Sequence, residues 1–139
     1  TDFHKVKTSY ADRDSNCLFC NLTSNNIKII DENELAIAFY DGYAVTQYHT
    51  LIIPKRHVSD YFELHAPELN AINQLVNKQK KLLEKKDKTI TGFNVGANVG
   101  EDAGQSIFHV HVHLIPRRSG DMEEPKGGVR GVIPSKQKY

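Results

Sequence analysis

The chain has 139 residues and a mass of 15.7 kDa, the size of one domain with a single buried core. Eighteen Lys and Arg against 17 Asp and Glu leave a net charge of +1, which excludes the strongly basic surface of a dedicated nucleic-acid or membrane-surface binder. No apolar run approaches the roughly 20 residues that cross a bilayer, and we expect no secretory signal. Two cysteines cannot form a disulfide framework, so we expect a cytoplasmic protein with reduced thiols.

Composition divides the chain into three parts. Residues 1–15 are polar and unpatterned, and we expect a flexible N-terminal segment there. Residues 16–121 carry the apolar patterns of a folded domain. Residues 122–139 form a Gly-rich, basic tail in which glycine and proline disfavour long regular elements.

Apolar patterning predicts one helix and several strands. The strands are expected at residues 35–40, 49–54, 89–98 and 107–116. Pro67 suits the first turn of a helix, and apolar residues then recur at helical spacing to about Lys86. The lysines on the opposite side of this helix predict a solvated face. A long helix among hairpin-like strands predicts an α+β fold with an antiparallel sheet.

The most informative feature is a row of three histidines, His109, His111 and His113, which alternate with apolar residues. Because a strand has a period of two, the imidazoles share one face and the apolar side chains pack behind them. Other polar residues would serve equally well on a merely exposed face. Three successive imidazoles therefore indicate chemistry.

Three kinds of chemistry fit such a row. A catalytic three-histidine zinc site is disfavoured, because His109 and His113 are about 13 Å apart on an extended strand. A jelly-roll metal site would need a carboxylate, and the next acids lie beyond Pro116. The loop at residues 96–106 offers glycine N–H groups, amides and a hydroxyl, which are suitable donors for a phosphate group. The sequence thus favours nucleophilic transfer at phosphorus.

Two segments resemble the hallmark stretches of the histidine triad (HIT) family of nucleotide hydrolases and transferases. They read GQSIFHVHVHLIPR at residues 104–117 and HTLIIPKRH at residues 49–57. The resemblance runs from about residue 17 to residue 121. It implies a five-stranded antiparallel sheet with one long helix, usually paired as a homodimer, and a purine nucleotide as substrate. It gives no reason to expect a nucleic-acid or membrane partner.

The resemblance also implies roles for individual residues. His111 is expected to attack the α-phosphorus and form a nucleotidyl-histidine intermediate. His113 would contact the phosphate oxygens, and Ser106 would bond near the leaving group. The other expected substrate-binding residues are Phe39 at the base, Asp41 at the ribose, and Asn98 and Gln105 at the phosphates.

A structural zinc site is the second expectation from the resemblance. The pair Cys17-x-x-Cys20 alone does not distinguish metal binding from redox chemistry or packing. In zinc-bearing members of the family, the matching ligands would be Cys17, Cys20, His49 and His109. Such a closed site with four ligands would have a structural rather than a catalytic role.

Other polar residues near these segments receive no functional role at this stage. His4, His57 and His65 are interpreted as ordinary histidines, and Lys55 and Arg56 as surface charges. Tyr48 stands where the family more often has Gly, which makes the backbone before His49 a point of interest.

The turn after the histidine row bears on the substrate. Residues 117–121 read RRSGD, which is similar to the Arg-rich turn of dinucleoside polyphosphate hydrolases. We therefore expect hydrolysis of a substrate such as diadenosine tetraphosphate, with the basic tail reaching over the polyphosphate or across a dimer. Nucleoside phosphoramidate hydrolysis, nucleotidyl transfer and a non-catalytic, zinc-stabilised nucleotide-binding module remain alternatives.

Overall fold

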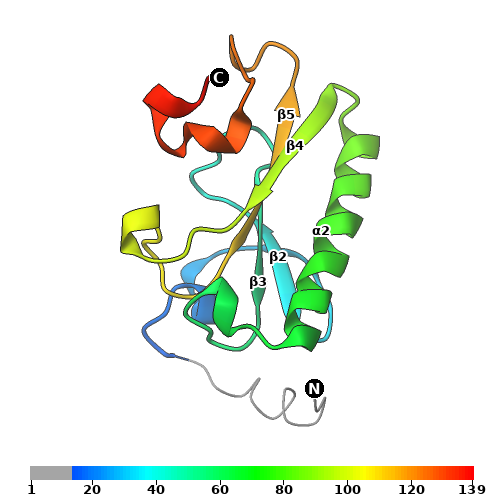
Figure 1. The fold of residues 1–139 in the computed structure, drawn as a ribbon. Helices are drawn as coiled ribbons and strands as arrows, with labels where there is room; N and C mark the ends of the chain where they lie inside the picture. Colours follow the sequence, from blue (N-terminus) through cyan, green and yellow to red (C-terminus); the bar gives the residue numbers. More distant parts are fainter. Residues whose placement is uncertain (1–13) are drawn as a thin grey trace.

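A computed structural model describes residues 14–139, so His4 and most of the expected N-terminal segment lie outside the described residues. Five antiparallel strands form one sheet in the order β1-β2-β3-β5-β4, and a single long helix, α2, lies along one face (Figure 1). The elements are β1 (Ile29–Glu32), β2 (Ala36–Tyr40), β3 (Thr50–Pro54), α2 (Ala66–Lys86), β4 (Ile90–Gly96) and β5 (Val112–Arg118). The expected α+β architecture is confirmed. No helix in the described part of the chain is long and apolar enough to span a membrane.

Short 3-10 turns complete the described chain. They are η1 (Phe19–Asn21), η2 (Thr23–Asn25), η3 (Tyr61–Glu63), η4 (Glu101–Ala103), η5 (Gly128–Val132) and η6 (Pro134–Lys136). The last two belong to the C-terminal tail, which lies beside β4 and β5 in Figure 1. The tail therefore contains only short turns, in keeping with its glycine and proline content.

A buried ion pair anchors the start of α2, which has Pro67 in its first turn as expected. The His65 N–H donates to Glu68 Oε1 at 2.8 Å. Glu68 is only 1% exposed and receives two hydrogen bonds from Arg56, at 2.9 and 2.8 Å. A buried carboxylate requires such a partner. Arg56 is thus a structural residue that ties the end of β3 to α2, and not the surface charge that the sequence suggested.

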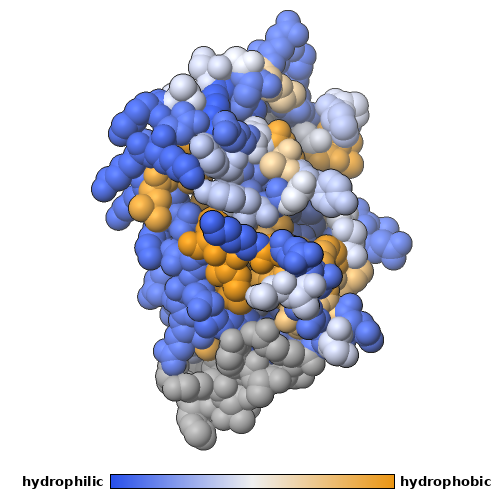
Figure 2. Space-filling view, turned by 180° about the vertical axis from the view of Figure 1, so that it is seen from behind, coloured by the Kyte–Doolittle hydropathy of each residue, from blue (hydrophilic) through white to orange (hydrophobic). Residues whose placement is uncertain are grey.

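The sheet separates two apolar clusters. Ile72 and Leu75 of α2 pack in one cluster with Val112 and Leu114 of β5. On the other face, Phe39 belongs to a second cluster built from β2, β3 and the N-terminal turns. The side of the molecule turned away from Figure 1 is largely hydrophilic, with an apolar area near its middle (Figure 2). Because one apolar cluster packs on each side, both faces of the sheet are covered.

One strand was missed, and both ends of β5 differ from the expectations. The short strand β1 was not predicted. Strand β5 begins at Val112 rather than at residue 107, because Val110 N–H bonds to the Val58 carbonyl, outside the sheet, at 2.8 Å. The strand also continues through Pro116, which pairs with Phe93 of β4. Proline is tolerated there because β3 pairs with β5 only as far as Leu114.

Candidate active site

The histidine row leads into β5, an inner strand of the sheet: His109 and His111 precede the strand, and His113 is its second residue. His113 pairs with Leu51 of β3 on one side and with Gly96 of β4 on the other. Leu51 belongs to the apolar cluster away from α2, whereas Val112 packs toward α2. The alternation expected from the sequence thus puts the imidazoles on the sheet face opposite the helix.

His111 is held by a backbone carbonyl. Its Nδ1 lies 3.0 Å from the His109 carbonyl oxygen, which can only accept a hydrogen bond. Nδ1 therefore carries the proton, and Nε2 carries the lone pair. The ring meets Phe19 edge-on at 5.2 Å and lies 5.3 Å from the His113 ring. This is the tautomer that a nucleophile at Nε2 requires.

His113 lies against a second histidine that the sequence assigned elsewhere. His49 Nε2 is 2.9 Å from His113 Nδ1 and 3.5 Å from Asp41 Oδ2. Burial, reinforced by the nearby imidazoles of His111 and His49, lowers the pKa of His113 to about 4. Burial also lowers the pKa of His49, although the Asp41 charge opposes this shift. Both rings are therefore neutral at pH 7.

Cys17, Cys20, His57 and His109 form a candidate metal centre, in which one ligand atom of each residue lies within 4.8 Å of the others. His109 Nδ1 is 3.5 Å from both sulfurs, and His57 Nδ1 is 3.3 Å from Cys20 Sγ. His109 Nε2 lies 2.8 Å from the Pro54 carbonyl, so Nε2 carries the proton and Nδ1 is free to ligate. Two thiols and two imidazoles are a suitable ligand set for zinc.

The expected ligand set needs one correction, because His57 occupies the place assigned to His49. Strands β3 and β5 are antiparallel, with Leu51 opposite His113 and Ile52 opposite Val112. Moving forward along β3 therefore means moving backward along β5. His49, before β3, meets His113, whereas the segment after Pro54 meets His109. The direction of the pairing puts His49 and His57 at opposite ends of the histidine row.

An apolar cavity of about 390 Å³ lies beside the row, on the face away from α2. Phe19, Phe39 and Leu51 line it, and Asp41 contributes the acidic group. Asp41 Oδ1 accepts the N–H of Tyr43 at 2.8 Å, which fixes the carboxylate. An apolar slot with one carboxylate can hold a base and bond to a ribose hydroxyl. Phe39 and Asp41 thus line the same cavity.

The loop before the row keeps its polar side chains in different environments. Gln105 is buried; its Nε2 donates to the Ser59 carbonyl at 2.7 Å and its Oε1 accepts the Gly100 N–H at 2.9 Å. Gln105 therefore secures the loop through its amide. Ser106 is exposed, and Asn98 lines a second cavity together with His113.

This second cavity, of about 580 Å³, is lined by His113 and bordered by the C-terminal tail. Among the described residues that line it, the polar ones are two histidines and two asparagines, and none is Lys or Arg. The lining residues include His49, His113, Asn94, Asn98, Val45, Val95, Ile115, Val129 and Val132. The tail's Arg130 instead donates to the carbonyls of Lys136 and Gln137, at 3.0 and 3.3 Å.

Arg117, in the turn after the row, is also engaged in structural contacts. Its guanidinium donates to both carboxylate oxygens of Asp121, at 2.8 and 2.7 Å, and to Asn94 Oδ1 at 2.8 Å. These bonds hold the pKa of Asp121 well below its usual range. The Arg-rich turn therefore braces the end of β5 against β4.

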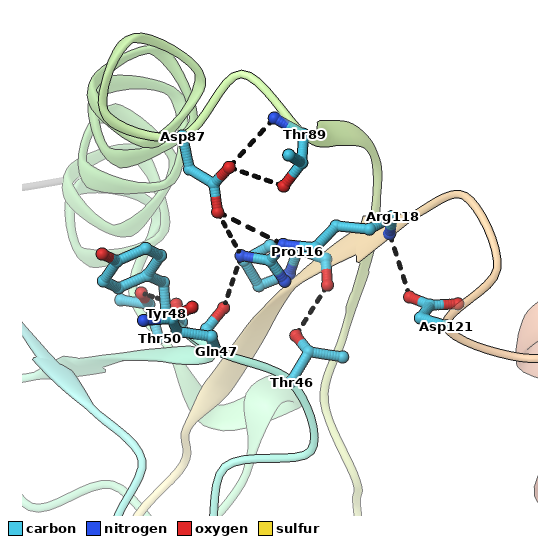
Figure 3. A network of polar contacts seen from close by, with 9 residues as sticks. All are labelled: Thr46, Gln47, Tyr48, Thr50, Asp87, Thr89, Pro116, Arg118 and Asp121. Carbon is cyan, nitrogen blue, oxygen red and sulfur yellow. Dashed lines mark hydrogen bonds and ion pairs between the residues drawn. The ribbon is translucent and has the colours of Figure 1, made fainter.

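Arg118 holds the loop that leads to His49 (Figure 3). Its side chain donates to Asp87 Oδ2 at 3.0 Å and to the Gln47 carbonyl at 3.1 Å. Thr46 Oγ1 donates to the Pro116 carbonyl at 2.6 Å. Hydrogen bonds from Thr89 and from Arg118 lower the pKa of Asp87 to about 2. The network thus fixes this loop to the end of α2 and to β5.

Tyr48, the residue before His49, adopts a left-handed backbone with φ = 72°. Few side chains adopt this conformation, whereas glycine adopts it readily. Contacts of the ring offset part of the strain: Lys86 Nζ lies 4.6 Å from its centroid, and the Tyr40 ring is 5.9 Å away. The turn at Tyr48 directs the chain into β3 with His49 buried.

Comparison with known proteins identifies relatives of this arrangement. A family model described as the HIT domain matches residues 23–120. An uncharacterized HIT-like protein of Mycoplasma genitalium, MG132, is 41% identical over 105 residues, which are 74% of each chain. An asymmetrical bis(5′-nucleosyl)-tetraphosphatase of Schizosaccharomyces pombe is 34% identical over 97 residues, 70% of this chain and 53% of that protein.

Two solved structures have the same fold. A HIT family protein from Bacillus anthracis is 38% identical, with a TM-score of 0.70 and coverage of 78% of each chain. A Zn-bound histidine triad family protein from Mycobacterium smegmatis is 29% identical, with a TM-score of 0.70 and coverage of 78% of this chain and 80% of that one.

Proposed function

Because the chain belongs to the HIT family, we propose that it is a nucleotide hydrolase that acts through a nucleotidyl-histidine intermediate on His111. The observation that carries the proposal is the hydrogen bond from His111 Nδ1–H to the His109 carbonyl, at 3.0 Å. It leaves the Nε2 lone pair for attack on phosphorus. A binding module would have no need for this tautomer.

The reaction proceeds in two displacements. The lone pair of His111 Nε2 attacks the α-phosphorus, the P–O bond to the leaving group breaks, and the leaving oxygen departs with the bonding electrons. Water then attacks the same phosphorus and loses a proton to solvent, while the P–N bond electrons return to Nε2. His113 stabilises charge on the phosphate oxygens, and Ser106 is available to the leaving group.

We propose the apolar cavity beside Phe39 as the nucleoside site, with Asp41 bonding the ribose. The base would stack among apolar side chains, and the carboxylate would accept hydrogen bonds from ribose hydroxyls. Asn98 and the loop that Gln105 secures would face the phosphates. A purine suits the 390 Å³ volume.

The substrate class we propose is a dinucleoside polyphosphate such as diadenosine tetraphosphate. The similarity to the S. pombe tetraphosphatase supports this choice. A second candidate, a nucleoside phosphoramidate, is favoured by the second cavity, because the residues described along its lining offer apolar side chains and amides but no Lys or Arg. A polyphosphate leaving group would gain from cations there, whereas an apolar amine would not.

We further propose that Cys17, Cys20, His57 and His109 bind a structural Zn²⁺. The fit rests on the donor set: two thiols and two imidazoles converge, and His109 turns its unprotonated Nδ1 to the sulfurs. Bound zinc would cross-link the N-terminal turns, the segment after β3 and the histidine row. Thiolate ligands need a reducing compartment, which supports a cytoplasmic location.

We also propose a homodimer formed along β4 and α2. Strand β4 is a sheet edge with Val95 half exposed, and an apolar cavity of about 300 Å³ separates it from α2. Phe62 lies at this cavity and is 80% exposed. A second copy would cover an edge and an apolar groove that are otherwise left to solvent.

Product analysis with diadenosine tetraphosphate tests the hydrolase proposal. The wild type should yield ATP and AMP, His111→Ala should yield neither, and His65→Ala, outside the site, should match the wild type. Alkaline quenching within the first turnover should trap a nucleotidyl-enzyme in the wild type only, because the P–N bond to histidine survives base but is lost in acid. Cleavage of an adenosine phosphoramidate alone would select the second candidate. Nucleotide binding without cleavage of either compound would refute the enzyme proposal in favour of a binding module.

A further inference from the structure

Asp41, His49 and His113 lie in contact with one another. Asp41 and His113 have roles in the proposed reaction, whereas His49, which lies between them, has none so far. His49 is 2% exposed and sits where the loop enters β3. Three polar atoms lie near its ring: the Val45 N–H at 3.0 Å from Nδ1, and His113 Nδ1 and Asp41 Oδ2 at 2.9 and 3.5 Å from Nε2. These three contacts determine where the proton on each ring resides.

The Val45 N–H decides the tautomer of His49. A backbone N–H can only donate, so His49 Nδ1 must be an acceptor without a proton. In a neutral imidazole the other nitrogen, Nε2, then carries the proton. Of the two acceptors near Nε2, His113 Nδ1 is closer by 0.6 Å (2.9 against 3.5 Å). His49 Nε2–H therefore donates to His113 Nδ1.

The same logic extends to His113. Because its Nδ1 accepts from His49, its own proton must be on Nε2. His113 Nε2 is buried and has no hydrogen-bond partner among the described residues. Leaving a buried N–H unpaired is unfavourable, so an acceptor that arrives with a ligand would satisfy it. A phosphate oxygen is such an acceptor.

We propose that His49 is a positioning residue which, itself fixed by the Val45 N–H, holds His113 as a neutral Nε2–H donor toward the phosphate group of the substrate. This inference deepens the hydrolase proposal and rests on it for the identity of the acceptor. His49 touches no reacting atom in this scheme. It determines which nitrogen of His113 faces the phosphate with a proton.

The tautomer also excludes a competing use of the group. The ligand atoms of Asp41, His49 and His113 lie close enough to hold a metal ion. A metal would need the lone pair of His49 Nε2, but that nitrogen carries the proton as long as Nδ1 accepts the Val45 N–H. Two imidazoles that share one proton in a hydrogen bond cannot both ligate an ion between them. Because the pKa of His113 is lowered to about 4, the His49–His113 pair does not take up an additional proton near neutral pH.

Two substitutions at His49 separate positioning from packing. His49→Phe fills a similar volume without a donor, and His49→Gln supplies an amide N–H where Nε2 stood. In single-turnover experiments, we expect His49→Phe to slow formation of the nucleotidyl-enzyme by about 10- to 100-fold with little change in KM. His49→Gln should recover most of that rate. Zinc content should equal that of the wild type in both variants, whereas His57→Gln should lose zinc.

Nitrogen-15 NMR of the histidine side chains gives a readout independent of activity. In the wild-type protein His113 should have a protonated Nε2 and an unprotonated Nδ1; in His49→Phe the two tautomers should mix. A wild-type His113 protonated on Nδ1 would overturn the inference, as would full-rate His49→Phe or zinc loss from it. If the wild type cleaves no nucleotide, the hydrolase proposal fails, while the NMR result still decides the tautomer. If His49→Phe does not fold, His49→Gln and the wild-type spectrum remain decisive.

Discussion

The strained turn before His49 leads to a quantitative prediction about Tyr48. A residue other than glycine in the left-handed region costs about 1–2 kcal/mol, and Tyr48 has φ = 72°. Glycine relieves this cost, but the larger conformational entropy of its unfolded chain destabilises the fold by about 0.4–1 kcal/mol relative to alanine. Comparing Tyr48→Gly with Tyr48→Ala removes the ring in both cases. The glycine variant should therefore be more stable by about 0.5–1 kcal/mol.

Urea unfolding at matched conditions measures this difference, and thermal melting should show a shift of about 2–4 °C per kcal/mol. Tyr43 supplies the control, because it lies in the same loop, is 95% exposed and has no positive φ. There the order should reverse, with Tyr43→Ala more stable than Tyr43→Gly. An alanine variant at least as stable as the glycine variant at position 48 would refute the argument from backbone strain.

Three further predictions concern parts of the fold around the site. His57→Ala should lower bound zinc from one equivalent per chain to well below one, measured by atomic absorption; unchanged zinc would remove His57 from the ligand set. Arg56→Met should destabilise the protein by about 3–5 kcal/mol, because it leaves the buried Glu68 carboxylate unpaired. Adding Glu68→Gln to this variant should restore part of the lost stability. A loss of stability below about 1 kcal/mol in urea unfolding would contradict the burial argument. Gly127→Ala should detach the tail, because Gly127 has φ = +94° and a Cβ there would overlap the Gln137 carbonyl. Proteolysis after residue 122 should then be faster than in the wild type, and equal rates would contradict the prediction.

The regular elements were largely predictable because one apolar pattern specifies each of them. The helix was expected from Pro67 to Lys86 and runs from Ala66 to Lys86. The missed strand, β1, has four residues, none of which is fully buried, so it carries no clear alternation. The stretch at residues 107–111 alternates like a strand. It remains outside the sheet because Val110 bonds to the loop after β3.

The site was only partly predictable, because chain direction and local hydrogen bonds decide what each residue meets. The sequence analysis assigned His49 to the metal and gave no role to His57, which lies eight residues later, beyond the same strand. Antiparallel pairing with β5 sends His57 toward His109 and His49 toward His113. This outcome follows from the expected sheet and could have been derived. The use of the Gln105 amide within its own loop could not, since it depends on where the Ser59 carbonyl lies.

The three histidines of the row differ in which ring nitrogen carries the proton, because a different partner contacts one nitrogen of each ring. His109 donates Nε2–H to the Pro54 carbonyl, which leaves the Nδ1 lone pair for the zinc that we propose. His111 donates Nδ1–H to the His109 carbonyl, which leaves the Nε2 lone pair for the nucleophilic role that we propose. His113 accepts at Nδ1 from His49, which leaves Nε2–H as a donor. Because the partners fix where the protons lie, replacing His49, the one partner here that is a side chain, should slow the reaction although His49 touches no reacting atom.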